Sequence, residues 1–301
     1  MAPDALRTPD SRFSNLDGWP FEPKYIDDLK GYEGLRMHYV DEGPKDAEVT
    51  FLCLHGEPSW SYLYRKMIPV FTEAGYRVVA PDWFGFGRSD KPTADATYTF
   101  DFHRGSAQAF LDYMGLKNVC LVCQDWGGLI GLTLPMDNPE MFTRLLVMNT
   151  GIGIGMPAGK GFHAWRDYVA NNPDFNVGRL MKRTTPILTE AEVAAYDAPF
   201  PDRSYMSGAR TFPALVPTSP DMPGVATGRR AVLFWSETWQ NPTFMAIGMK
   251  DPVLGPPAMA MLASTLNGCP EPMEIADGGH FVQEWGEPIA KAALAHFGLG
   301  V

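Results

Sequence analysis

An aspartate lies where an apolar stretch of this chain meets a glycine-rich one. Residues Val119–Cys123 are apolar and partly β-branched, as in a buried parallel strand. After Asp125, the run Trp126–Gly128 opens a helix whose small residues allow a very tight turn. Residues Cys123–Gly127 therefore have the pattern of a nucleophile elbow, small-x-nucleophile-x-Gly, with Asp in the position of the usual Ser.

The replacement of Ser by Asp changes the chemistry available to such an elbow. An Asp carboxyl has an ordinary pKa of about 3.9 and is already ionised at neutral pH, whereas a Ser hydroxyl needs a base to remove its proton. A carboxylate gains nothing by attacking an amide or an ester, but it is suited to displacing a leaving group from an sp3 carbon. We therefore predict that Asp125 is a nucleophile. The alternative is an aspartate that only caps the helix.

A general base is needed to hydrolyse the alkyl ester that this displacement would form, and the chain contains six histidines. Only His280 lies in a glycine-rich loop after a late strand, where the chain order nucleophile, acid, histidine places it. Asp251 follows the strand-like run Thr243–Gly248 and would fix the imidazole tautomer. The alternative acid is Asp277, which we interpret as a turn residue.

A second turn is expected to face the elbow. The apolar run Thr50–Leu54 leads into His55-Gly56-Glu57-Pro58, and ligands of open α/β sheets collect beyond the carboxyl ends of the strands. In hydrolases with a nucleophile elbow, this turn and the residue after the nucleophile supply the backbone N–H groups of an oxyanion hole. Those donors would be the amides of Glu57 and Trp126. We interpret His55 as a buried, hydrogen-bonded turn residue.

The elements that must position these residues alternate along the chain between strand-like and helical runs. This alternation predicts an α/β fold with a mainly parallel, doubly wound sheet and helices on both faces. The first strands precede any helix and are expected to pair antiparallel. Strands are predicted over Met37–Asp41, Thr50–Leu54, Arg77–Pro81, Val119–Cys123, Arg144–Asn149, Thr243–Gly248 and Pro272–Ile275, and helices over Tyr62–Ala74, Phe100–Met114, Trp126–Asp137, Arg229–Trp239 and Glu287–Phe297.

The pattern changes between residues 156 and 225, where nine prolines occur and no strand is evident. We predict an inserted helical cap over residues 156–225. The core would then consist of a first part, residues 1–155, and a second part, residues 226–301.

Size and composition exclude several classes of protein. With 301 residues and 45% apolar content, the chain is large enough for a substantial core. A net charge of −10 argues against nucleic-acid and anionic membrane partners. No apolar run approaches the roughly 18 residues of a membrane span, and no signal-peptide pattern is present, so we expect a cytoplasmic protein. Four cysteines indicate no disulfide framework, and no metal-binding motif is evident.

Two glycine-rich segments resemble functional motifs without matching them. Gly85–Asp90 contains Ser89, but its neighbours are not those of an elbow. Gly151–Gly161 is similar to a phosphate-binding loop, but its first glycine is one place out of register and no Ser or Thr follows Lys160. We assign neither a chemical role, although Gly151–Gly155 is expected to affect flexibility near the cap.

At these residues the chain resembles the haloalkane dehalogenases of the α/β-hydrolase superfamily, over nearly its whole length. The HGxP motif is shared with epoxide hydrolases, whereas Gln-Asp-Trp-Gly together with Gly-Phe-x-Ala-Trp is more specific. The latter pair points to a subfamily that binds halide with two tryptophans and takes its catalytic acid after the later strand. The matching segments are His55–Arg65, Val122–Gly128, Gly161–Trp165, Gly248–Asp251 and Gly279–Glu284.

The resemblance implies a role for each matching residue. Asp125 would be the nucleophile, His280 the base and Asp251 its partner, while the indole N–H groups of Trp126 and Trp165 would hold the departing halide. An indole N–H suits this task because it donates and carries no acceptor to repel an anion.

The resemblance also implies that Phe162, Phe212 and Pro213 line the substrate cavity; ordinary packing of cap against core is the alternative. The implied reaction converts a small halogenated alkane and water into an alcohol, a halide ion and a proton, through a covalent alkyl-aspartate ester. It needs no cofactor or metal, and we expect a monomeric enzyme of detoxification.

Three alternatives remain at this stage. An epoxide hydrolase uses the same Asp elbow and needs cap tyrosines, for which Tyr168, Tyr196 and Tyr205 are candidates. A fluoroacetate-type dehalogenase is less favoured because no arginine follows the nucleophile. A non-catalytic protein with a hydrolase fold would have no use for the Asp/His/Asp set.

Overall fold

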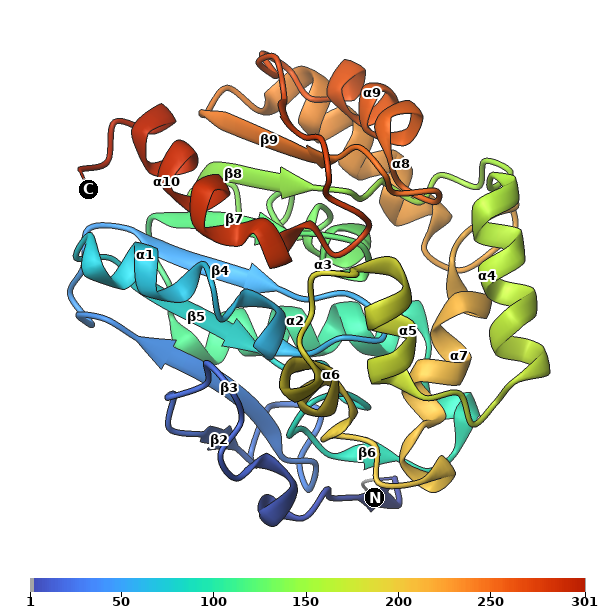
Figure 1. Cartoon of the computed structure of the whole chain (residues 1–301). Coiled ribbons are helices and arrows are strands. Elements are labelled where there is room, and N and C mark those ends of the chain that lie inside the picture. Colours follow the sequence, from blue (N-terminus) through green and yellow to red (C-terminus); the bar gives the residue numbers. More distant parts are fainter. Residues whose placement is uncertain (1–2, 301) are drawn as a thin grey trace.

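A twisted eight-stranded sheet forms the centre of the computed structural model, which describes residues 3–300 (Figure 1). Its strand order is β10-β9-β8-β7-β4-β5-β3-β2. Strands β4, β5, β7, β8, β9 and β10 pair parallel, while β3 pairs antiparallel with both β2 and β5. The predicted parallel sheet with an antiparallel beginning is therefore confirmed. The strands are β2 (Lys24–Ile26), β3 (Met37–Glu42), β4 (Thr50–Leu54), β5 (Arg77–Pro81), β7 (Val119–Cys123), β8 (Phe142–Met148), β9 (Thr243–Gly248) and β10 (Met273–Ile275); β1 (Ala5–Leu6) and β6 (Lys91–Pro92) form a separate pair.

Helices cover both faces of this sheet. One buried apolar cluster joins the sheet to α1 (Ile68–Glu73) and α10 (Gly286–His296). The other joins it to α2 (Phe100–Met114), α3 (Trp126–Gly131), α8 (Val225–Leu233) and α9 (Pro256–Thr265). Because both faces are covered, β4, β7 and β9 are buried at every residue, which explains their continuous apolar sequences.

Cysteines 120 and 123 show how the strand period distributes neighbouring residues. Cys120 belongs to the cluster on the α1 and α10 face and Cys123 to the cluster on the opposite face. Both thiols are free and buried, so the Cys-x-x-Cys pattern on β7 is core packing, as the strand geometry predicts.

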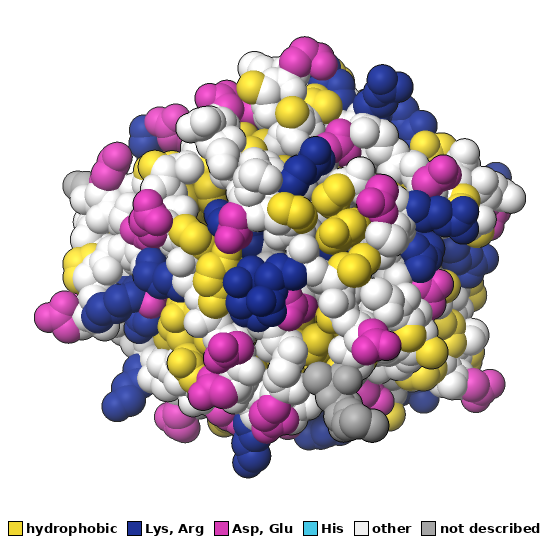
Figure 2. All heavy atoms as spheres, turned by 90° about the horizontal axis from the view of Figure 1, so that it is seen from below, with side chains coloured by type: hydrophobic (Ala, Val, Ile, Leu, Met, Phe, Trp, Pro, Cys, Tyr) yellow, Lys and Arg dark blue, Asp and Glu magenta, His cyan; other side chains and the backbone are white. Residues whose placement is uncertain are grey.

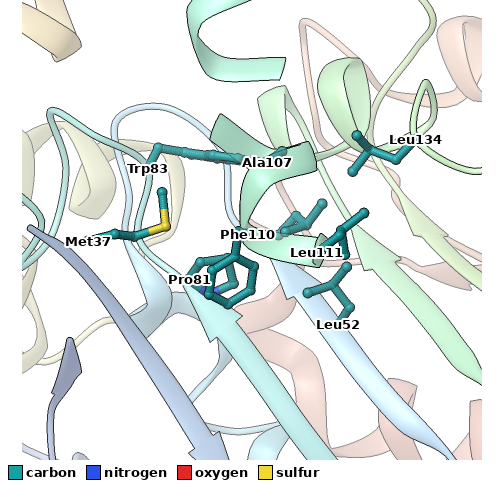
Figure 3. Close-up of a pocket in the computed structure, with 9 residues that line it drawn as sticks. Met37, Leu52, Pro81, Trp83, Ala107, Phe110, Leu111 and Leu134 are labelled. Atoms are coloured by element: carbon teal, nitrogen blue, oxygen red, sulfur yellow. The ribbon is translucent and has the colours of Figure 1, made fainter. Parts of the chain in front are cut away.

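Helix α2 packs tightly on the sheet near its centre. Phe110 and Leu111 of this helix lie against Leu52 of β4 and Pro81 at the end of β5, around a small apolar gap (Figure 3). Trp83 closes the same region and donates its indole N–H to the His55 carbonyl at 2.6 Å. This packing fixes the turn after β4, which faces the elbow.

No strand of the central sheet lies between the end of β8 at Met148 and the start of β9 at Thr243. The intervening chain is mostly helical, and its helices lie beyond the edge toward which the central strands point (Figure 1). They are α4 (Lys160–Asn171), α5 (Val177–Thr184), α6 (Glu190–Asp197) and α7 (Ser207–Leu215), followed by α8. The cap limits at residues 156 and 225 stay a prediction.

Prolines account for most differences between the predicted and observed helices. The helix predicted over Tyr62–Ala74 is a short 3-10 turn followed by α1, which starts anew with Pro69 in its first turn. Helix α3 ends at Gly131 instead of reaching Asp137, because Pro135 has no N–H to donate to the Gly131 carbonyl and its ring clashes with that carbonyl in a helix. Helix α9, which begins at Pro256-Pro257, was not predicted.

On the face seen in Figure 2, acidic and basic side chains are interspersed with exposed apolar ones. Within residues 3–300, no helix combines the length and the apolar character needed to span a bilayer.

Candidate active site

Asp125 occupies a strained turn between β7 and α3. Its backbone has φ 51° and ψ −125°, a region that non-glycine residues rarely adopt. The turn is pressed against both neighbouring strands, since a Cβ at Gly127 would lie 1.9 Å from the Leu54 carbonyl oxygen. On the β8 side, Thr150 donates its hydroxyl to the Asp125 carbonyl at 2.7 Å. The local sequence therefore has to be glycine-rich, and the strain holds the carboxylate out from the sheet.

The Asp125 carboxylate is held between a backbone amide and an imidazole. The Glu57 N–H donates to Oδ1 at 2.7 Å, and His280 Nε2 lies 3.4 Å from Oδ2. A Cβ at Gly56 would meet Oδ1 at 2.4 Å, so the turn after β4 approaches this closely only because it lacks a side chain there. The side chain is 16% exposed, which leaves one edge open to a reactant.

His280 and Asp251 form a buried hydrogen-bonded pair. The loop between β10 and α10 brings His280 Nδ1 to 2.8 Å from Asp251 Oδ2. Asp251 in turn accepts from the Val253 amide at 2.8 Å and from Asn149 Nδ2 at 3.0 Å. With its carboxylate fixed on three sides, Asp251 directs His280 Nε2 toward Asp125.

The two carboxylates dominate the charge on His280. Burial alone would lower the pKa of the imidazole, but Asp251 and Asp125 together raise this pKa well above its usual value. Burial likewise opposes ionisation of Asp251, and the His280 charge nevertheless keeps the pKa of that carboxyl below its ordinary range. Loss of the negative charge on Asp125 would therefore lower the pKa of His280 and make Nε2 a better proton acceptor.

Glu57 contributes a second acidic group to the site. Its side chain is buried, and Oε1 has no hydrogen-bond partner within the described part of the chain. Burial and the neighbouring charge of Asp125 raise the pKa of the Glu57 carboxyl well above its usual range, with the Trp165 side chain opposing the shift. Burial beside a second carboxyl group therefore disfavours ionisation of Glu57.

His55 and Asp277 were interpreted from the sequence as turn residues, and neither contacts the Asp125 carboxylate through a hydrogen bond. His55 is fully buried, and its ring nitrogens lie 2.9 Å from the Gly56 carbonyl and 3.0 Å from the Trp83 amide. Burial lowers the pKa of this imidazole. Asp277 has a 79% exposed side chain and pairs with Lys250.

Gln124 and Asn149 contact the triad and were not singled out from the sequence. Gln124 Nε2 lies 3.1 Å from His280 Nε2 and donates to the His280 carbonyl at 3.0 Å, while Gln283 donates to its Oε1 at 3.3 Å. The Asp125 amide also donates to the backbone carbonyl of Asn149 at 3.0 Å. The sequence offered two signals for them: Gln124 is next to the nucleophile, and Asn149 is at the end of a predicted strand.

A cavity of about 870 Å³ lies over the triad, between the sheet edge and the cap helices. Asp125 and His280 form part of its floor. Trp126 and Trp165 both line it, the former from α3 and the latter from α4. Its remaining lining is mainly apolar.

Two of the three expected pocket residues line this cavity, namely Phe162 and Pro213. Phe212 does not. It is fully buried behind Trp126, with ring centroids 4.6 Å apart, and also packs on Phe86 at 4.8 Å. As neighbours on helix α7, Phe212 and Pro213 point in different directions, so Phe212 supports the tryptophan and Pro213 contacts the cavity.

The described residues include no group of three or more His, Cys, Asp or Glu side chains arranged to hold a metal ion.

Comparison with known proteins adds independent findings. A sequence model described as the α/β hydrolase fold matches residues 49–287. The haloalkane dehalogenase of Psychrobacter cryohalolentis is 48% identical over 293 residues, covering 95% of each chain. That of Mycobacterium marinum is 43% identical, covering 93% of this chain and 95% of its own. The solved tetrameric structure of haloalkane dehalogenase DpaA from Paraglaciecola agarilytica NO2 has 54% identity and a TM-score of 0.96, covering 97% of this chain and 98% of that one.

Proposed function

Because the chain belongs to the haloalkane dehalogenases, a family with the α/β-hydrolase fold, we propose that it hydrolyses small haloalkanes to an alcohol, a halide ion and a proton. The observation that carries the proposal is the Asp125 carboxylate, which faces His280 on one side and the Glu57 amide on the other, at the floor of a mainly apolar cavity. An apolar cavity suits a substrate that offers almost no hydrogen-bonding groups.

In the first step, an ionised Asp125 oxygen attacks the halogen-bearing carbon from the side opposite the halogen. The carbon–halogen bond breaks, the halide departs with the electron pair, and Asp125 becomes an alkyl ester. The indole N–H groups of Trp126 and Trp165 stabilise the departing anion. Neither donor carries a formal charge, so the halide is released after the reaction without breaking an ion pair.

In the second step, a water molecule attacks the carboxyl carbon of esterified Asp125. His280 takes the water proton at Nε2, and Asp251 stabilises the imidazolium that forms. The amides of Glu57 and Trp126 hold the developing oxyanion. Esterification has removed the Asp125 charge, which lowers the pKa of His280 at the moment a base is required. The tetrahedral intermediate then collapses: the bond between the carboxyl carbon and the alkyl oxygen breaks, the alkyl oxygen takes a proton and leaves as the alcohol, Asp125 is again a carboxylate, and one proton passes to solvent.

The tyrosines do not support epoxide hydrolysis. Tyr168 lines the cavity, but Tyr196 is fully buried and hydrogen-bonds to Glu284. Tyr205 is not among the lining residues either. A pair of phenols facing the nucleophile, as protonation of an epoxide oxygen requires, is therefore missing from the cavity wall.

Single turnover in heavy-oxygen water tests the proposal. With enzyme in excess over 1,2-dibromoethane, the water oxygen should enter the Asp125 carboxyl group, giving a 2 Da mass increase on the peptide that contains it. Asp125→Ala should release no bromide. Label in the alcohol alone, or substantial bromide release by Asp125→Ala, would show that water attacks the substrate directly.

Cellular location and assembly are finer parts of the proposal. We place the protein in the cytoplasm, as expected from the sequence. The monomer stays a prediction, and the DpaA enzyme at 54% identity is described as a tetramer. Light scattering on the purified protein distinguishes the two states.

A further inference from the structure

The cavity over the triad is much larger than a two-carbon haloalkane needs. It encloses about 870 Å³, whereas an apolar cavity of about 150 Å³ already holds a six-carbon aromatic ring. A short substrate would leave most of the volume to water, against a mainly apolar wall. The size and lining therefore match a longer hydrocarbon.

Residues Gly151 to Ile154 of the glycine-rich segment Gly151–Gly155 line this cavity, and the glycines of the segment serve different purposes. A Cβ at Gly153 would lie 2.9 Å from the Pro217 side chain, and Gly155 has φ 81° and packs on Pro220. These two glycines allow the segment to pack against the chain that follows α7. They explain the segment's shape, and not the width of the cavity.

Gly151 differs from both. It lines the cavity, its φ lies outside the left-handed region, and a Cβ there would meet no atom within 4 Å. It directly follows Thr150, whose hydroxyl holds the Asp125 backbone. The missing side chain thus leaves space in the chain next to Thr150, where a Cβ would fit and a larger side chain would narrow the cavity.

The outer end of the cavity is apolar and open. Met156, from the segment after Gly155, is 57% exposed, and Met261 of α9 is 60% exposed, yet both line the cavity. Large exposed apolar side chains at a cavity mouth favour entry of apolar molecules, and unbranched methionine side chains adapt to different shapes. Met156 and Met261 therefore form an apolar rim on the same cavity that Asp125 and Gly151 line.

We propose that this enzyme prefers elongated monohaloalkanes of about six carbons or more, and that Gly151 determines this preference. This inference rests on the proposed function. The halogen-bearing carbon lies at Asp125, and the tail extends along the wall formed by Gly151 and Ile152 toward Met156. Each methylene of the tail leaves water for an apolar wall.

A chain-length series measures this preference. With bromoethane, 1-bromobutane, 1-bromohexane and 1-bromooctane, kcat/KM for bromide release should rise about fourfold per methylene up to six carbons, as burial of a CH2 group predicts. A series that is flat or falls with length overturns the inference. If bromoethane is also left intact, the proposed function fails instead.

The variant Gly151→Leu tests the residue. It should lower kcat/KM for 1-bromohexane and 1-bromooctane at least tenfold and leave bromoethane within about threefold. The matched control is Gly159→Leu, because Gly159 also lines the cavity with no atom within 4 Å of a Cβ but lies farther along the chain, before α4. It should lower kcat/KM for 1-bromohexane by less than Gly151→Leu does.

Equal losses at every chain length, or the same length profile for both variants, would contradict the role of Gly151. If Gly151→Leu does not fold, Gly151→Ala should still shift the preference toward shorter chains by a few-fold.

Discussion

Two histidine–aspartate pairs of nearly equal geometry lie in this protein, and one of them is in the proposed active site. His280 Nδ1 is 2.8 Å from Asp251, and His38 Nδ1 is 2.7 Å from Asp82. Both carboxylates are fully buried. Each also accepts backbone amides, from Val253 in one case and from Ser61 and Arg88 in the other. The hydrogen bond itself therefore does not distinguish a catalytic pair from a structural one.

The difference lies on the far side of the imidazole. His280 Nε2 faces the carboxylate of Asp125, and the side chain is 12% exposed at the cavity floor. His38 is 1% exposed, has its ring tilted against that of Tyr25 and does not line the cavity. The proposed base therefore has a second carboxylate and access to a reactant, whereas the His38–Asp82 pair joins strand β3 to the residue after β5. Substitutions in both pairs test this distinction.

The largest expected effect comes from replacing the imidazole. His280→Gln should lower kcat for halide release by about 10⁴-fold, because a general base contributes up to that factor. The alkyl ester on Asp125 should then accumulate, and intact-protein mass spectrometry measures the added alkyl group.

His38→Gln is the matched control. It removes an equally short hydrogen bond and leaves Asp82 buried without this partner, so we expect kcat within a few-fold and a free energy of unfolding lower by about 3 kcal/mol. If folded His38→Gln lost turnover, the His38–Asp82 pair would not be a purely structural one, and the comparison would fail.

The elements that hold the proposed active pair could be predicted well from the sequence. Strands β4, β5, β7 and β9 have the predicted limits, because burial on both faces requires continuous apolar runs bounded by turn residues. The elbow at Asp125 was recognisable because a strained turn between two strands permits few residues other than glycine around the nucleophile.

The structural pair was not predictable in the same way. His38 and Asp82 are 44 residues apart, and neither belongs to a motif with a known spacing. Phe212 was misplaced for a related reason, since the family resemblance assigned it to the cavity together with Pro213, and the sequence does not show which of the two meets Trp126. Gln124 and Asn149 act through contacts that only the assembled sheet edge creates.

The two histidine–aspartate pairs should differ in how their contributions to the free energy of unfolding change in acid. Burial opposes ionisation of Asp82, but His38 and His55 with the Arg88 amide lower the pKa of this carboxyl from 3.8 to about 2. Ionised Asp82 therefore stabilises the fold above pH 3.8, and this contribution, about 2 kcal/mol, is lost as pH falls toward 2. The raised pKa of His280 has the opposite consequence for stability. The charged imidazole stabilises the fold below about pH 6.5, so acid does not remove the contribution of His280.

Urea unfolding of the wild type and of Asp82→Asn at pH 6, 4 and 3 measures the difference. The gap between their free energies of unfolding should narrow as pH decreases, because the variant has no carboxylate to protonate. A gap that stays constant over this range would mean that Asp82 is not the group that senses acid.

The smallest expected effect is at Asp277, the alternative acid, which lies three residues before His280. Asp277→Asn should leave kcat within about twofold and the midpoint of urea unfolding unchanged, since an exposed ion pair contributes little. Asp251→Asn should lower kcat about 10²-fold or more, because an amide cannot stabilise the imidazolium as a carboxylate does. Initial rates on one brominated substrate measure the loss of kcat in both variants. A larger loss in Asp251→Asn would show that contact in space, and not nearness in sequence, identifies the carboxylate that orients His280. Equal effects would imply that the loop, and not the buried contact with Asp251, orients His280.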